Sequence, residues 1–246
     1  MSGEAEELWR AGRVLAAEGL VNAFGHISTR VDESTIEITP PVPLGTLTRS
    51  TPRDQIDLTA DELPPGVPKE AWIHVTIYRA RPDVRAICRA QPEYATALVS
   101  AGLLIRPLHG HGSFLGEPVP VFKDSRLVRD VSRARSLAQV LRDTHAIVMR
   151  GNGAVTVGRN VAEAVGRMWV LEKSARMNAI AASAGVPAPL PEPEQEAWRS
   201  TSSELLPRIW TYLTDLHAAE TVSPDSDPAD ADNTTPTSDP REDEPT

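Results

Sequence analysis

Hydrophobic residues recur along this chain at two spacings, one typical of helices and the other typical of strands. Between residues 4 and 18, Leu8 and Leu15 lie on one helical face, and Gly19 then provides a stop. The same criteria predict helices over residues 69–80, 92–100, 124–142, 160–184 and 192–216. Alternation and short apolar runs predict strands over residues 26–31, 35–39, 55–58, 84–88, 146–149 and 154–157, with a strand, a loop and a second strand over 106–122. Such interleaving predicts one mixed α/β domain over residues 1–217.

The last part of the chain, residues 218–246, has a different composition. From Glu220 onward it contains nine acidic residues, five prolines and a single basic residue, Arg241. Nine acids less one base give −8, almost the whole formal net charge of −9. No large apolar residue follows Val222, so the segment cannot bury enough surface to offset the entropy lost on ordering. It is predicted to be a disordered acidic tail.

Composition and charge placement narrow the class of protein. No apolar run approaches the ~20 residues that span a bilayer, and the N-terminus lacks the pattern of a secretory signal. Cys88 is the only cysteine, which excludes an intrachain disulfide and a thiolate metal site. The body carries no stripe of lysine and arginine, which argues against nucleic acid. We expect a cytoplasmic protein that binds a small molecule, with neither nucleic acid nor membrane as a partner.

The residues most suggestive of chemistry lie between positions 70 and 91, in the stretch EAWIHVTIYRARPDVRAICRAQ. Glu70 stands at the start of a predicted helix, and His74 follows one turn later as a hydrogen-bonded core residue. A short apolar strand then ends in Arg89 and Gln91, which share a face because side chains alternate along a strand. The stretch therefore predicts a polar site where this helix and this strand meet.

The landmarks of the chain occur in an order that resembles one known family. They are Gly-His-Ile-Ser-x-Arg, Ile-Thr-Pro, Leu-Thr, Glu-x-x-x-His on a helix, Arg-Pro-Asp-Val before a strand, and Arg-Gly-x-Gly before a helix. Their shared order over about residues 7–184 is similar to the class II aldolase/adducin family. The resemblance implies a three-layer α/β/α sandwich around a central, mostly antiparallel sheet. It also implies a homo-oligomer, a tetramer in many members, with the active site between subunits.

In the enzymatic members of this family, three histidines hold a divalent metal and a glutamate shuttles a proton. The resemblance places Arg89, Gln91 and Asn152 at the three ligand positions, and Glu70 at the position of the glutamate. Arginine is a permanent cation that repels a metal, and amide oxygens are poor ligands for zinc. We therefore predict no zinc site and no other cofactor.

The positions that bind phosphate in the sugar-phosphate aldolases of the family differ as well. The resemblance aligns them with His26, Pro40-Pro41 and Pro68-Lys69. Proline lacks the backbone N–H group that cradles a phosphate. A non-phosphorylated substrate is therefore expected.

Together these residues predict a site in which Glu70 and Arg89 are catalytic. Arg89, in the former metal position, would hold a carboxylate or an enolate, and Glu70 beside it would transfer a proton. The predicted substrate-binding residues are His26, Ser28, Lys69, Gln91, His109, His111 and Asn152. The set favours a metal-independent lyase of the aldolase, decarboxylase or dehydratase type, acting on a small non-phosphorylated carbonyl or carboxylate compound.

Two alternatives remain open on the sequence alone. The first is an inactive, adducin-like assembly or binding module, in which Glu70 and Arg89 form a structural ion pair. The second is a metal-dependent aldolase with a rebuilt site. On an extended segment, His109 and His111 would share a face and reach one metal. The third ligand would then be Glu70 or His26.

Overall fold

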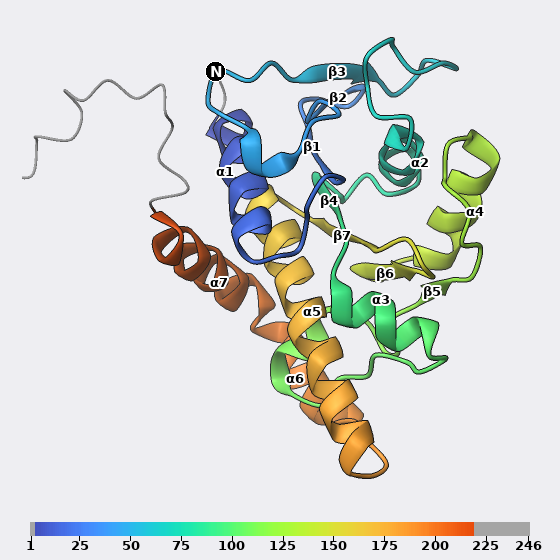
Figure 1. Cartoon of the computed structure of the whole chain (residues 1–246), viewed down its shortest axis with the longest axis vertical. Helices are drawn as coiled ribbons and strands as arrows, with labels where there is room; N and C mark the ends of the chain where they lie inside the picture. Colours follow the sequence, from blue (N-terminus) through green and yellow to red (C-terminus); the bar gives the residue numbers. More distant parts are fainter. Residues whose placement is uncertain (1–2, 219–246) are drawn as a thin grey trace, which may run out of the picture.

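A seven-stranded sheet crosses the molecule in the order β3-β2-β1-β4-β7-β6-β5 (Figure 1). The computed structural model describes residues 3–218, so the predicted acidic tail, apart from Ala218, lies outside the described residues. All neighbouring strands are antiparallel except β5 and β6. The strands are β1 (His26–Arg30), β2 (Thr35–Ile38), β3 (Asp54–Asp57), β4 (Ala86–Ala90), β5 (Val121–Phe122), β6 (Ala146–Met149) and β7 (Ala154–Gly158).

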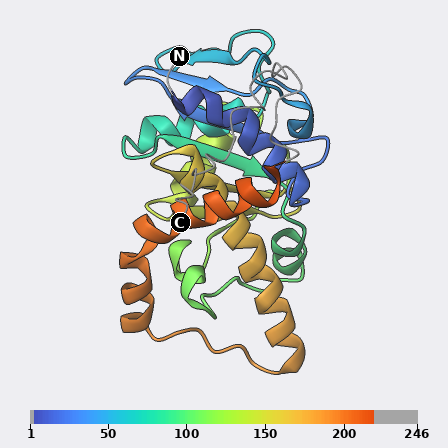
Figure 2. The ribbon, with the colours of Figure 1, turned by 90° about the vertical axis from the view of Figure 1, so that its left-hand side faces the viewer.

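Helices cover both faces of this sheet. One face carries α2 (Ala71–Ala80) and α4 (Val131–Leu141), which pack together. The other face carries α1 (Gly3–Ala17), α3 (Glu93–Ser100), α5 (Val161–Ala184) and α7 (Ser202–Leu216), of which α1, α5 and α7 lie side by side (Figure 2). The remaining elements of residues 3–218 are α6 (Glu192–Ser200) and two 3₁₀ helices, η1 (Leu44–Thr46) and η2 (Gly110–Phe114). The predicted central, mostly antiparallel sheet between helical layers is confirmed.

Alternation along the strands divides the apolar core into two. Ile27 and Cys88 belong to the core on the α5 side, whereas Ile87 belongs to the core on the α2 side. Arg89 follows two residues after Ile87 and therefore projects toward α2, into a largely apolar layer. Among the helices of residues 3–218, none is long and apolar enough to cross a bilayer.

Two segments differ from the prediction in the kind or number of their elements. Residues 106–122 contain η2 and the two-residue β5 instead of two strands. Any side chain on Gly110 would overlap the ring of Trp198, so packing against α6 determines the shape of this segment. The predicted helix over 192–216 is in fact two helices, α6 and α7, which meet at Thr201.

The helices α4 and α5 both begin at a residue whose side chain caps the first turn, but α4 begins later than predicted. Asn160 caps α5 as expected, because its side chain accepts a hydrogen bond from the N–H of Glu163 at 2.8 Å. The cap of α4 is Asp130, which accepts from the N–H of Arg133 at 2.9 Å. The predicted start at Asp124 is wrong, since that carboxylate binds arginine side chains instead.

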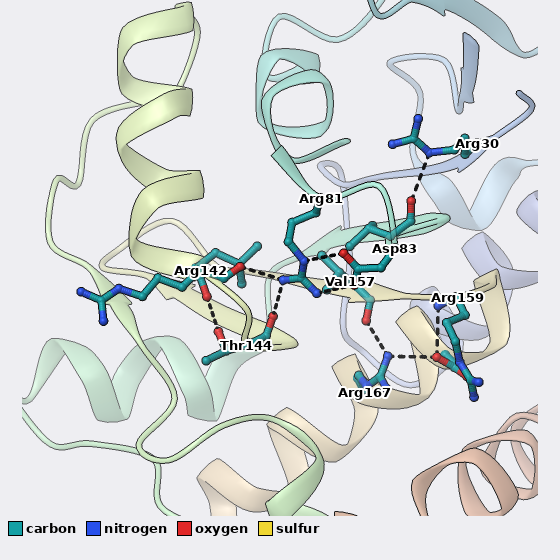
Figure 3. Close-up of polar contacts among 11 residues, drawn as sticks. Arg30, Arg81, Asp83, Arg142, Thr144, Val157, Arg159 and Arg167 are labelled. Carbon is teal, nitrogen blue, oxygen red and sulfur yellow. Dashed lines mark hydrogen bonds and ion pairs between the residues drawn. The ribbon is translucent and has the colours of Figure 1, made fainter. Parts of the chain in front are cut away.

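The Arg-Pro-Asp motif closes the corner between α2 and β4 (Figure 3). Arg81 donates from Nε and Nη2 to the two carboxylate oxygens of Asp83, at 2.8 and 2.7 Å. Its Nη1 also donates to the backbone carbonyls of Arg142 and Thr144, at 2.7 and 3.3 Å. These carbonyls lie in the turn between α4 and β6, so one side chain joins two distant parts of the chain.

We predict that Arg81→Met lowers the free energy of unfolding by about 1–3 kcal/mol, because two carbonyls lose a charged donor. Arg126→Met is the matched control: Arg126 makes the same two-pronged contact with Asp124, two residues away, but on the surface. Urea unfolding followed by circular dichroism measures both variants. An equal decrease in the free energy of unfolding in both variants would contradict the role of Arg81 in joining these two parts of the chain.

Candidate active site

The candidate site lies where β1 and β4 pair beneath the start of α2. In the antiparallel register, His26 is opposite Arg89 and Ser28 is opposite Ile87. Because side chains alternate along a strand, His26, Ser28 and Arg89 all project from the face that α2 covers. Glu70 is the residue that immediately precedes α2, and its carboxylate reaches Arg89 from above the sheet.

Arg89 is the centre of a closed set of polar contacts. Its Nη2 lies 3.2 Å from Oε2 of Glu70 and donates to Oδ1 of Asn152 at 2.9 Å. Nδ2 of Asn152 in turn donates to Oε1 of Glu70 at 3.2 Å. Arg89 is only 1% exposed, yet its Nε and Nη1 have no hydrogen-bond partner within the described part of the chain. The guanidinium therefore keeps buried N–H groups available.

The turn between β6 and β7 brings Asn152 to this contact. Gly151 and Gly153 both have positive φ angles, 72° and 82°, which glycine adopts without strain. A Cβ on Gly153 would collide with the carbonyl oxygen of Ala90 at the end of β4. Because only glycine fits here, the turn can lie close enough to β4 for Asn152 to reach Arg89.

A second polar chain runs from β1 into α2. Nδ1 of His26 lies 2.7 Å from Nε2 of His74, and Nδ1 of His74 lies 2.6 Å from Oγ of Ser28. The same Oγ lies 2.9 Å from Oη of Tyr78. All four side chains are buried. Among residues 3–218, Nε2 of His26 finds no hydrogen-bond partner and stands 4.0 Å from Oε2 of Glu70.

Burial sets the protonation of these groups. Desolvation lowers the pKa of His74 to about 3, with a further contribution from the Arg89 cation. Desolvation also lowers the pKa of His26 well below its usual value, and the neighbouring His74 and Arg89 add to this. Both imidazoles are therefore neutral at pH 7. Burial lowers the pKa of Arg89 while Glu70 opposes the shift, and a guanidinium stays charged.

A cavity of about 230 Å³ opens beside these groups. Its lining contains three cationic side chains and one acidic side chain. This local excess of positive charge contrasts with the formal net charge of −9 for the whole chain. The surroundings therefore suit an anion. A space of about 150 Å³ is enough for benzene, so a single-ring acid is near the upper size. The polar side chains of the lining are His26, Lys69, Glu70, Arg89 and Arg129.

The structure brings most of the predicted site residues together. Asn152 bonds to Arg89 and Glu70, and Ser28 belongs to the buried polar chain that includes His26. Gln91 follows β4, half-buried, where its backbone N–H donates to the carbonyl of Leu20 at 2.8 Å. The predicted site residues that line the cavity are His26, Lys69, Glu70 and Arg89.

His109 and His111 lie elsewhere, at the start of η2, which packs against α5 and α6. Nε2 of His109 is 2.9 Å from Oγ of Ser174, and the ring of His111 is 5.6 Å from that of Trp198. The prediction of one extended segment fails after His109: His109 itself is extended, whereas His111 lies in η2. Within residues 3–218, no group of three or more histidine, cysteine, aspartate and glutamate side chains is placed to hold a metal.

Sequence reasoning missed two contributors to the site. Tyr78 extends the polar chain, and Arg129 lines the cavity from the loop before α4. Glu70, His74 and Tyr78 are spaced by four residues, and this helical spacing is the signal that identifies them as one face. Arg129 has no local signal, since only the folded chain brings its loop to β4.

The residues at this site do not fit zinc. The oxygen of the Asn152 side chain already accepts from Arg89, and a fixed cation lies 3.2 Å from the carboxylate of Glu70. Nε2 of His26 and the carboxylate of Glu70 are the donors that remain. Two donors beside a positive charge are fewer than the three protein ligands that a catalytic zinc takes.

Comparison with known proteins identifies the family of this chain. The sequence profile of the Class II Aldolase and Adducin N-terminal domain matches residues 6–179. The chain belongs to the class II aldolase and adducin family. A 3,4-dihydroxyphthalate decarboxylase of Terrabacter sp. is 32% identical over 197 residues, covering 74% of this chain and 82% of the relative. A 3,4-dihydroxyphthalate decarboxylase of Rhodococcus jostii is 33% identical over 198 residues, covering 71% and 79%.

Solved structures of the family share the fold of this chain. The L-fuculose 1-phosphate aldolase from Glaciozyma antarctica matches with a TM-score of 0.74 and 22% identity, covering 89% of this chain and 91% of that one. At this identity the likeness concerns the fold alone. Together with the decarboxylase relatives, the family assignment confirms the prediction of a class II aldolase-like lyase.

The buried histidines predict how stability depends on pH. The pKa of His74 falls from 6.5 to about 3 on folding, so the unfolded chain binds its proton more readily between these values. The contribution of His74 is complete above pH 6.5, decreases as pH falls, and is lost near pH 3. Its slope within the window is about 1.4 kcal/mol per pH unit.

Urea unfolding at several pH values between neutral and acidic tests this, with His74→Gln as the comparison. The variant is expected to show the shallower slope, because one titrating group is gone. His145, whose pKa burial also lowers, contributes equally to both proteins. His26 loses the part of its pKa shift that His74 supplies, which makes the slope of the variant shallower still. Identical slopes would contradict a neutral, buried His74.

Proposed function

We propose that this class II aldolase-like lyase is a metal-independent decarboxylase of a small, non-phosphorylated acid. The observation that carries the proposal is Arg89, a buried cation that borders a small cavity and has two N–H-bearing nitrogens without a partner among the described residues. Two relatives whose names say that they are 3,4-dihydroxyphthalate decarboxylases support decarboxylation among the possible lyase reactions.

Decarboxylation leaves on carbon the electron pair of the broken C–C bond. That pair is delocalised onto an oxygen, which becomes an enolate or a phenolate. The free N–H groups of Arg89 suit this oxyanion, because its charge develops in the transition state. Binding the departing carboxylate itself would stabilise the ground state, since that charge disappears as CO₂ forms. Arg89 therefore serves as the electrophile in place of a metal ion.

The cavity lining supports the proposed class of substrate. Lys69 and Arg129 are exposed cations that attract an acid and can retain a second carboxylate. Phe24 contributes an apolar surface that a ring or a short carbon chain contacts. Pro41 and Pro68 occupy lining positions where they offer no N–H group to a phosphate.

A purely structural ion pair is a poorer account of Arg89. Buried ion pairs are favourable when additional hydrogen bonds satisfy the remaining donors. Leaving a buried donor unpaired costs about 1–3 kcal/mol. Nε and Nη1 of Arg89 are both unpaired among the described residues, and an oxyanion in the cavity would supply their acceptor. This favours an enzyme over an inactive, adducin-like module.

The charge that a metal would supply is proposed to come from Arg89 alone, with no resident cofactor. Glu70 and Asn152 then act as the partners that orient the guanidinium. This role replaces the proton transfer expected of Glu70 from the sequence, because Arg89 and Asn152 already engage its carboxylate. Glu70 also lies close enough to stabilise a positive charge on His26. We further propose that the protein is a homo-oligomer, as family resemblance implies. Light scattering after size-exclusion chromatography tests this state directly.

Metal content is the first measurement that separates the proposed site from a metal-dependent one. Elemental mass spectrometry is applied to purified, untagged protein before and after incubation with zinc, manganese and iron. We expect background metal after dialysis and turnover that a chelator leaves unchanged. Near-stoichiometric metal that survives dialysis would overturn the metal-independent mechanism.

Turnover is tested by CO₂ release from 3,4-dihydroxyphthalate, salicylate, phthalate and a phosphorylated sugar acid. Arg89→Lys keeps the charge but loses the planar fork, and it is expected to lower kcat by about 10²–10³-fold. Glu70→Gln keeps the shape of the side chain, and it is expected to lower kcat because Arg89 loses its counter-charge. Arg126→Lys, on the surface, is the control. Unchanged kcat in Arg89→Lys would contradict the proposal, provided that thermal melts show both variants folded.

A further inference from the structure

The polar chain behind the cavity has a preferred direction. Oη of Tyr78 donates to the backbone carbonyl of Arg85 at 3.4 Å, and a carbonyl can only accept. Because the hydroxyl proton of Tyr78 is then directed at the carbonyl of Arg85, Oη of Tyr78 accepts a hydrogen bond from the hydroxyl of Ser28. Ser28 then accepts from Nδ1–H of His74, so Nε2 of His74 carries a lone pair. That lone pair accepts from Nδ1–H of His26, and Nε2 of His26 is left unprotonated.

The same contacts make fewer hydrogen bonds if every donor and acceptor of the chain is reversed. If Tyr78 donated to Ser28, the bond to the Arg85 carbonyl would be lost, and each imidazole would carry its proton on Nε2. The N–H of His26 would then be buried, with the nearest carboxylate oxygen of Glu70 at 4.0 Å, beyond hydrogen-bond distance. The first direction makes one more hydrogen bond and buries no unpaired donor on His26.

On the basis of the decarboxylation proposed above, we propose that Nε2 of His26 is the proton-accepting atom of the site. His74, Ser28 and Tyr78 are positioning residues that hold it in this tautomer. His26 lines the cavity and is opposite Arg89 in the strand register, so both side chains border the space in which the substrate is proposed to bind. The pKa of each imidazole is lowered by burial, and the neutral form that this tautomer requires is present at pH 7.

This pairing of a bare imidazole nitrogen with a guanidinium selects a class of substrate. The substrate is an acid that carries a hydroxyl group on the unsaturated carbon next to the carboxylate-bearing carbon, as in a phenol or an enol. The hydroxyl donates to His26, and its oxygen accepts from the free N–H groups of Arg89. The name 3,4-dihydroxyphthalate describes a compound with such a hydroxyl, which agrees with the relatives.

The reaction balances with these two side chains and one proton from water. His26 takes the hydroxyl proton, and the oxygen becomes an oxyanion bound to Arg89. The imidazolium gives that proton to the carbon that bears the carboxylate, while the oxyanion becomes a carbonyl. The C–C bond to the carboxylate then breaks, CO₂ leaves, and the electron pair returns to the oxygen. The oxyanion takes a proton from water and becomes a hydroxyl again.

The tautomer can be measured without any substrate. Imidazole ¹⁵N NMR of the full chain at pH 7.5 resolves its six histidines, and the His26→Gln variant identifies the signal of His26. We expect the proton of His26 on Nδ1 and a bare Nε2. A proton on Nε2, or a doubly protonated ring, would overturn the proposal.

Kinetics test the positioning role. Tyr78→Phe and Ser28→Ala remove hydroxyls from the chain, and both are expected to lower kcat about tenfold or more while KM changes little. Their ¹⁵N spectra should show His26 as a mixture of tautomers. Thr76→Val is the matched control, because it removes a buried hydroxyl from α2 that bonds only to backbone carbonyls of the helix. His26→Gln is expected to lower kcat by about 10²-fold or more.

A methyl ether tests the role of the hydroxyl. Wild-type protein is given 3,4-dihydroxyphthalate and its ether at the hydroxyl next to the carboxylate. We expect the ether to inhibit competitively without releasing CO₂. Turnover of the ether, or an unchanged kcat in His26→Gln, would overturn the proposal while leaving decarboxylation intact. Absence of CO₂ from every acid tested would instead overturn the proposed function and the proton transfer together, and the NMR result would still decide the tautomer.

Discussion

The ion pair between Arg89 and Glu70 lies where water solvates neither group well, and this constrains the surrounding chain. Removing a charge from water costs several kcal/mol after relaxation, so each polar atom of the guanidinium needs a partner. Glu70 supplies one from the start of α2, and Asn152 supplies another from a turn that requires glycine on both sides. Nε and Nη1 of Arg89, a residue that borders the cavity, are left without a partner among the described residues. Unpaired donors destabilise a core, whereas a site that binds an oxyanion requires donors that the protein itself leaves unpaired.

The proposed replacement of a metal ion by a guanidinium would change which reactions the fold can catalyse. A metal ion polarises a carbonyl and also lowers the pKa of a bound water, so it supports hydrolysis as well as aldol chemistry. A guanidinium donates hydrogen bonds in one plane and cannot generate hydroxide. Like a metal ion, it can stabilise the negative charge of an enolate or a phenolate. Decarboxylation requires this charge stabilisation but no metal-bound hydroxide, since the leaving group is neutral and no nucleophile has to be activated.

Much of the fold can be predicted because its determinants are local. Asn160 caps α5 through a contact three residues away, and alternation in β4 alone places Arg89 on the face opposite Cys88. The resemblance to the family adds Glu70 and Asn152 to the site. The shape of η2 follows from the Trp198 ring over Gly110, a contact between distant segments that no local pattern encodes. Arg129 escapes prediction for the same reason.

The neighbours of His26 give it opposing properties that suit the proposed proton transfers. Burial and the nearby cation lower its pKa, which makes the imidazole a weak base but its conjugate acid a strong donor. Protonating carbon is the step that benefits from a strong donor. The weak base is adequate because Arg89, by stabilising the oxyanion, makes the substrate hydroxyl more acidic. A more basic, solvent-exposed histidine would take the proton more readily and return it less readily. In the proposed reaction the same guanidinium makes the hydroxyl more acidic and the imidazolium a stronger donor, and the register of β1 and β4 holds both groups on one face of the sheet.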